Sequence, residues 1–145
     1  MLRITSGDLL YSGCDALVNT VNCVGVSGAG LAKQFARMYP QTDQAYKQEC
    51  RYGLYYPGVV RPYVAHGQTL LYVATKDDWR FASKIEWVER GIKGIRELMF
   101  KLQLGSVAIP PMGAGLGRLD PDDVLVLVRE YLGGAPFDVL YYATR

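Results

Sequence analysis

The stretch ALVNTVNCVGVSGAGLAKQF, residues 16–35, decides the expected fold. Its first six residues are mostly apolar and β-branched, which predicts a strand covered on both faces. Gly25, Gly28 and Gly30 then form a glycine-rich turn, and from Leu31 the apolar residues recur at helical spacing. A strand, a glycine turn and a helix in this order predict an anion site, because the free N–H groups of the helix start face the ligand.

Two amides, Asn19 and Asn22, lie at the carboxyl end of this expected strand. Amide side chains are unfavourable in a buried strand unless something uses their hydrogen bonds. The two amides are therefore the unusual feature of this strand.

Length and composition limit the classes of protein to which this chain could belong. The 145 residues favour one domain, residues 1–145, with one sizeable core. A net charge of +2 neither requires nor excludes a nucleic-acid partner. Three cysteines without CxxC spacing favour a reduced, cytoplasmic protein, and the single histidine, His66, gives little support for a metal site or a Ser-His-Asp triad. No apolar run approaches the roughly 18 residues of a membrane span, so no membrane partner is expected.

Strands alternate with helices along the rest of the chain. Strands are expected at residues 2–5, 70–74, 106–109 and 137–142, with a weak one at 59–60. Helices are expected at 31–39, 42–51, 83–102 and 121–132, the third opened by a capping box of Ser83 and Glu86. This alternation implies a layered α/β fold with the sheet between helices.

A second glycine loop, PPMGAGLG at residues 110–117, follows the strand at 106–109. Two such loops at the ends of strands suggest a pyrophosphate that backbone N–H groups hold from both sides. The expected ligand is a nucleotide diphosphate that requires no metal.

Several side chains near these loops have two interpretations. Lys76 follows a strand end, where open α/β sheets bind ligands, although local sequence alone favours a solvated lysine paired with Asp77 or Asp78. Asp8 is either a turn or cap acid or an acceptor for a ligand amino group. Trp79 is either a lid contact or a core anchor. The tyrosine- and arginine-rich segment 52–63 suits nucleic acid or, more simply, an irregular edge with packed tyrosines.

These motifs together resemble the macro domain. The resemblance rests on GDLL at 7–10, VNTVN at 18–22, the loop 25–30 and the loop 110–117, and it covers nearly the whole chain. NTVNCVGV at 19–26 and Thr75-Lys76 followed by Trp79-Arg80 are similar to the branch that contains the DarG antitoxins and the eukaryotic terminal ADP-ribose glycohydrolase. The resemblance implies a three-layer helix–sheet–helix fold with a mixed central sheet.

The resemblance also implies ADP-ribose as the ligand and assigns residue roles. Asp8 would accept from the adenine amino group, the backbone of Leu9 would line the adenine pocket, and Asn22 would hold the distal ribose and support catalysis. Lys76 matches the catalytic lysine, and its job as nucleophile, proton donor or electrostatic support stays open. The remaining contacts would come from Gly28, Ala29, Gly30, Thr75, Met112, Gly113, Ala114, Gly115, Leu116 and Gly117.

One departure bears on the reaction. The eukaryotic enzyme has an acidic residue in the second loop where this chain has Gly117, so the pattern is closer to DarG. The implied function is a hydrolase that removes ADP-ribose from DNA, with thymine as the expected base, and so reverses a DarT-type toxin. Arg51, Arg61, Trp79 and Arg80 would contact the single-stranded DNA.

Two other functions stay open at this point. One is a module that binds ADP-ribose without turnover, and the other is a hydrolase of ADP-ribosylated protein glutamate or of O-acetyl-ADP-ribose. DarG antitoxins are expected to carry a second, toxin-binding domain. A DarT-type toxin is therefore a direct partner only if such a domain exists. No cofactor is expected.

Overall fold

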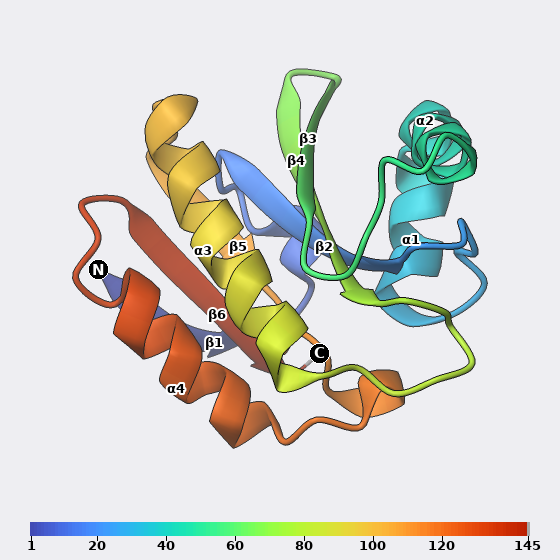
Figure 1. The fold of residues 1–145 in the computed structure, drawn as a ribbon. Coiled ribbons are helices and arrows are strands. Elements are labelled where there is room, and N and C mark those ends of the chain that lie inside the picture. The colour runs from blue at the N-terminus through green and yellow to red at the C-terminus, as the bar shows by residue number, and fades with distance from the viewer. Residues whose placement is uncertain (145) are drawn as a thin grey trace.

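A six-stranded sheet between two pairs of helices makes up the computed structural model, which describes residues 1–144 (Figure 1). Its strands run in the order β1-β6-β5-β2-β4-β3. Neighbouring strands are parallel except for β3 and β4, which form an antiparallel hairpin. The mixed three-layer architecture is confirmed. The strands are β1 Leu2–Ser6, β2 Ala16–Asn22, β3 Val60–Ala65, β4 Gln68–Lys76, β5 Ser106–Ile109 and β6 Asp138–Thr144.

Strand β2 lies inside the sheet and is buried on both faces, as its apolar run predicts. Ala16 and Val18 belong to one apolar cluster, whereas Leu17 and Val21 belong to the cluster on the opposite face. Side chains that alternate between two clusters in this way require helices on both sides of the sheet.

Four helices cover the two faces of the sheet, two on each face (Figure 1). Helices α1, Gly30–Met38, and α2, Pro40–Arg51, cover one face, and Phe35 and Tyr46 are their fully buried contacts. Helices α3, Ile85–Lys101, and α4, Pro121–Leu132, cover the other face. Gly91 allows α3 to approach β4 closely, because a Cβ there would lie 2.5 Å from Cγ1 of Val73.

The edge formed by β3 is longer than the weak strand predicted at residues 59–60. Its tyrosines pack rather than stand free, since the hydroxyls of Tyr55 and Tyr63 lie 2.6 Å apart and that of Tyr63 donates to Glu49. Arg61 forms an ion pair with the same carboxylate. Tyr55, just before β3, and Tyr63 therefore pack as one interpretation expects, but their hydroxyls bond within the protein, whereas Tyr52 and Tyr56 are exposed.

The predicted capping box is wrong. Helix α3 begins at Ile85 with Lys84 as its N-cap, and no side chain caps it. Ser83 lies outside the helix because its N–H donates to the carbonyl of Gly117 at 3.0 Å, which ties it to the second glycine loop. A tertiary contact has thus overridden a local signal. Within residues 1–144, no helix combines the length and apolarity needed to cross a membrane.

Candidate functional site

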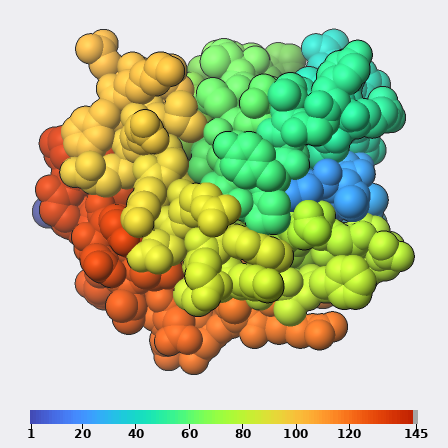
Figure 2. Space-filling view, viewed as in Figure 1, coloured from blue at the N-terminus to red at the C-terminus, as the bar shows by residue number. Residues whose placement is uncertain are grey.

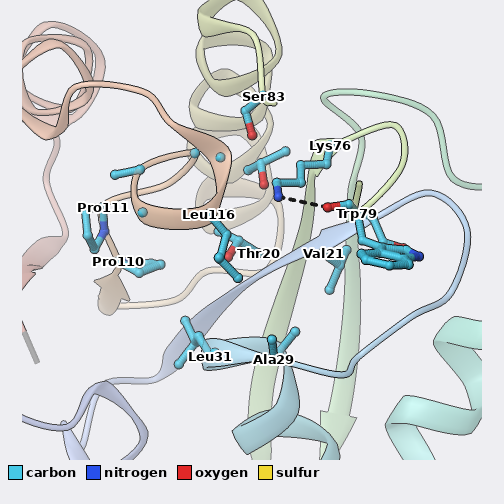
Figure 3. Close-up of a pocket in the computed structure, with 18 of the residues that line it drawn as sticks. Thr20, Val21, Ala29, Leu31, Lys76, Trp79, Ser83, Pro110, Pro111 and Leu116 are labelled. Atoms are coloured by element: carbon cyan, nitrogen blue, oxygen red, sulfur yellow. Dashed lines mark hydrogen bonds between the residues drawn. The ribbon is translucent and has the colours of Figure 1, made fainter. Parts of the chain in front are cut away.

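A pocket of about 600 Å³ opens where β2, β4 and β5 end, between the two glycine loops. This volume lies in the range of small-molecule sites. Figure 3 shows Leu116 of the second loop above the pocket, with Ala29 of the first loop and Leu31 of α1 below it. The predicted residues that line it are Leu9, Asn22, Gly28, Ala29, Gly30, Thr75, Lys76, Trp79, Gly113, Ala114, Gly115, Leu116 and Gly117. The two loops therefore do face one another across one site.

The first loop is shaped from within by the buried side chain of Asn22. Its Oδ1 accepts from the N–H groups of Val24, Gly25 and Val26 at 3.0–3.2 Å, and its Nδ2 donates to the carbonyl of Val26 at 2.8 Å. The hydroxyl of Tyr46 donates to the carbonyl of Asn22 at 2.6 Å. The hydrogen bonds of this amide are thus used by its own loop, whereas Oδ1 of the buried Asn19 has no partner among the described residues. The contact of Asn22 with a ribose stays a prediction.

The second loop turns twice through left-handed backbone, at Gly113 with φ of +75° and at Gly115 with φ of +63°. Leu116 follows with its side chain 68% exposed and lines the pocket. Met112, however, is fully buried in the cluster under α3 and α4 and does not line the pocket. The predicted ligand contact of Met112 is therefore wrong, because its apolar side chain packs in the core.

Lys76 is positioned by an irregularity between β2 and β4. The register shifts after Val21, so that Asn22 pairs with Lys76 instead of Thr75. The N–H of Cys23 donates to the carbonyl of Lys76 at 3.1 Å. This pairing fixes the start of the lysine side chain against the first loop.

The amine of Lys76 faces the pocket and donates to the carbonyl of Trp79 at 3.3 Å (Figure 3). Burial, reinforced by repulsion from Arg118, holds the pKa of Lys76 below its ordinary value. The ion pair predicted from local sequence is wrong for Asp78, which pairs with Arg80 at 2.7 Å. A partly desolvated lysine of this kind is typical of reactive sites.

Besides Met112, four predicted contacts lie outside the pocket lining: Asp8, Arg51, Arg61 and Arg80. Asp8 is exposed and caps a short 3-10 turn at Leu9–Tyr11, where its carboxylate accepts from the N–H of Leu10 at 3.0 Å. Its capping role is confirmed, and its adenine contact stays a prediction beside Leu9. Arg80 and Arg51 are exposed and stay predictions as DNA contacts. Trp79, 53% exposed at the pocket, fits a lid contact better than a core anchor.

Sequence reasoning missed several lining residues. Seven of them belong to the two quoted stretches, 16–35 and 110–117: Thr20, Val21, Val26, Leu31, Ala32, Pro110 and Pro111. The other two, Ser83 and Tyr142, come from distant segments in which no signal indicated the pocket. Ser83 lies in the segment that links β4 to α3 and brings a hydroxyl to the pocket wall. In Figure 2 this segment, in yellow-green, lies beside the orange loop that leads to α4.

The chemistry available is therefore backbone N–H groups, a few hydroxyls and one amine. Across residues 1–144, no group of three or more His, Cys, Asp or Glu side chains is placed to hold a metal ion. Apolar walls with a few placed polar groups suit a nucleotide-like ligand.

Comparisons with known proteins agree with this geometry. The family model of the macro domain matches residues 18–128. The DNA ADP-ribosyl glycohydrolase of Mycobacterium tuberculosis is 41% identical over 86% of this chain, and that of Thermus aquaticus is 40% identical over 91%. The chain spans 36% and 38% of the lengths of these two relatives.

Solved structures give the same result. The macrodomain of Thermus aquaticus DarG superposes with a TM-score of 0.92 and 38% identity, covering 99% of this chain and 98% of that one. The Thermosipho africanus DarTG structure in complex with ADP-ribose also has a TM-score of 0.92, with 28% identity, and covers 99% of this chain and 41% of that one. With its two facing glycine loops and the family match across most of its length, this chain belongs to the macro domain family.

Proposed function

We propose that this chain hydrolyses the bond between ADP-ribose and a nucleobase in DNA, with thymine as the expected base. The observation that carries the proposal is the amine of Lys76, partly desolvated in the pocket between two glycine loops. Relatives about 40% identical are named DNA ADP-ribosyl glycohydrolases, and the similar Thermosipho africanus DarTG was solved with ADP-ribose. The reaction reverses a DarT-type modification and takes place in the cytoplasm.

In this proposal ADP-ribose lies along the pocket with its adenine at one end and its distal ribose at the other. The N–H groups of residues 28–30 and 113–117 surround the diphosphate, which needs no metal there. The adenine lies toward Leu9, next to Asp8, and the distal ribose lies toward Lys76. Trp79 is exposed at that end and offers an aromatic face for the DNA that leaves the pocket.

The reaction breaks the bond between the anomeric carbon and the base nitrogen. A water molecule supplies the hydroxyl of the released ADP-ribose and the proton of the restored base. Lys76 acts as nucleophile at the anomeric carbon, as proton donor to the base, or as electrostatic support for the developing charge. The lowered pKa increases the share of free amine, which the nucleophilic role requires.

The decisive experiment uses single-stranded DNA that carries ADP-ribose on thymine. Mass spectrometry of released ADP-ribose and restored DNA compares the wild type, Lys76→Ala and Lys101→Ala. Lys101 is an exposed lysine at the end of α3 and serves as the matched control. We expect Lys76→Ala to lose about 10²- to 10⁴-fold in rate, as for loss of a general acid or base, and Lys101→Ala to lose nothing. Equal rates for the wild type and Lys76→Ala would refute the assignment.

A second candidate is a module that binds ADP-ribose without turnover. The observation that favours it is Gly117, which leaves no acidic side chain at that position beside the amine. Calorimetry would then show ADP-ribose binding while modified DNA stays intact. The same assay on ADP-ribosylated protein glutamate and on O-acetyl-ADP-ribose separates a hydrolase of those esters from the DNA enzyme.

A further inference from the structure

The hydroxyl of Ser83 is a polar group that the fold leaves without a partner. The residue is only 6% exposed, and its Oγ makes no hydrogen bond within the protein. Ser83 also lines the pocket, on the side of Lys76 and the second loop (Figure 3). A buried and unpaired hydroxyl is costly, so such a group in a native structure needs an explanation.

The explanation is not local structure. Lys84, and not Ser83, is the N-cap of α3, so the hydroxyl does not cap the helix. The backbone of Ser83 is held to the second loop by its N–H, which donates to the carbonyl of Gly117 at 3.0 Å. The backbone of Ser83 is therefore held at the pocket wall, and its Oγ has no hydrogen-bond partner in the described part of the chain.

Gly117 separates this hydroxyl from the amine of Lys76. A Cβ built on Gly117 would lie 2.6 Å from Oγ of Ser83 and 3.8 Å from Cε of Lys76. The glycine leaves that space open. The Ser83 hydroxyl and the Lys76 side chain thus border the same space at Gly117.

We propose that Ser83 is a further substrate-binding residue whose Oγ hydrogen-bonds the sugar at the Lys76 end of ADP-ribose. This inference rests on the proposed function, which places the distal ribose there. A serine hydroxyl both donates and accepts, so it matches the hydroxyl groups of a ribose. A nucleotide that lacks this sugar, such as ADP, leaves the Ser83 hydroxyl unpaired.

The test compares the affinities of ADP-ribose and ADP by calorimetry for the wild type and Ser83→Ala. We expect about three- to tenfold weaker binding of ADP-ribose, the value of one hydrogen bond, and unchanged binding of ADP. The melting temperature should stay the same or rise by a few degrees, because alanine removes an unsatisfied buried hydroxyl. This pair of results separates a ligand contact from a structural role.

Ser106→Ala is the matched control. The Oγ of Ser106 accepts from the N–H of Asp15 at 2.8 Å, and Ser106 does not line the pocket. We expect this variant to melt at a lower temperature and to keep the ratio of the two affinities.

Two outcomes would overturn the role of Ser83. One is unchanged ADP-ribose affinity in Ser83→Ala, and the other is an equal loss for ADP-ribose and ADP together with a lower melting temperature. Neither measurement uses DNA. A wild-type chain that leaves modified DNA intact would overturn the DNA activity alone, and the affinity comparison would still decide the role of Ser83.

Discussion

Replacing Gly117 by alanine tests the packing at the centre of the site. The backbone of Gly117 does not have a positive φ, so alanine meets no conformational strain there. The new Cβ would instead lie 2.6 Å from Oγ and 3.3 Å from Cβ of Ser83. The first distance is shorter than any ordinary contact, so the Ser83 hydroxyl has to move.

The magnitude follows from two opposing effects. Overpacking of this kind costs about 1–3 kcal/mol. Alanine also restricts the unfolded chain, which returns about 0.4–1 kcal/mol. We therefore expect Gly117→Ala to lower the free energy of unfolding by about 1–2 kcal/mol. In the Ser83→Ala background the 2.6 Å contact is gone, and the same change should cost about 0.5 kcal/mol or less.

Urea unfolding of the wild type, the two single variants and the double variant gives the coupling free energy directly. Gly134→Ala is the control, because a Cβ at Gly134 would meet no atom within 4 Å. We expect it to leave stability unchanged or slightly raised. If Gly117→Ala costs the same with and without the Ser83 hydroxyl, the hydroxyl does not occupy the position from which the substrate contact was inferred.

Three further predictions concern the amine, the first loop and the adenine end. Arg118→Gln removes a positive charge that helps to lower the pKa of Lys76. The pKa of Lys76 should therefore rise, and the matching inflection of the pH–rate profile should move to higher pH. An unmoved inflection would exclude an effect of Arg118 on the Lys76 amine. A rate that increases with pH through this inflection would identify a free-amine role, and a rate that decreases would identify the ammonium. Asn22→Ala should cost about 1–3 kcal/mol in urea unfolding and slow hydrolysis, because three loop N–H groups lose their acceptor; wild-type stability would show that the loop holds itself. Asp8→Ala should weaken ADP-ribose binding in calorimetry more than it lowers kcat. Asp8→Asn keeps an oxygen that accepts from the N–H of Leu10, so it controls for loss of the cap. Unchanged affinity in Asp8→Ala would remove Asp8 from the binding site.

Much of the fold followed from regular patterns. The apolar run at residues 16–21 predicted a strand buried on both faces, and the alternation of strands and helices predicted the layers. The ends of elements were less reliable, since they depend on contacts with distant segments. The start of α3 is the example: Ser83 and Glu86 have the spacing of a capping box, yet Ser83 is bound to Gly117 in another loop.

The parts of the site that could be predicted are those that one continuous segment forms by itself. Both glycine loops and Lys76 line the pocket as expected. Met112 was assigned to the ligand only by the resemblance of its loop, whereas the structure buries its side chain in the core. Tyr142 and Thr20 were missed because each sits within a strand whose apolar pattern indicated only core packing. Which strand residues border a pocket depends on tertiary neighbours, and one chain read in isolation does not contain that information.

The extra residue in β4, Thr75, has a consequence for how the sequence around this pocket can evolve. If the ladder had stayed regular beyond Ala74, Thr75 would stand opposite Asn22, and Lys76 would fall one step further along. The side chain that stands opposite Asn22 is therefore set by a single unpaired step in the backbone. A one-residue insertion between Ala74 and Thr75 would place Thr75 opposite Asn22 and so put a hydroxyl where the amine stands. The proposed activity would then be lost without a substitution at Lys76 itself.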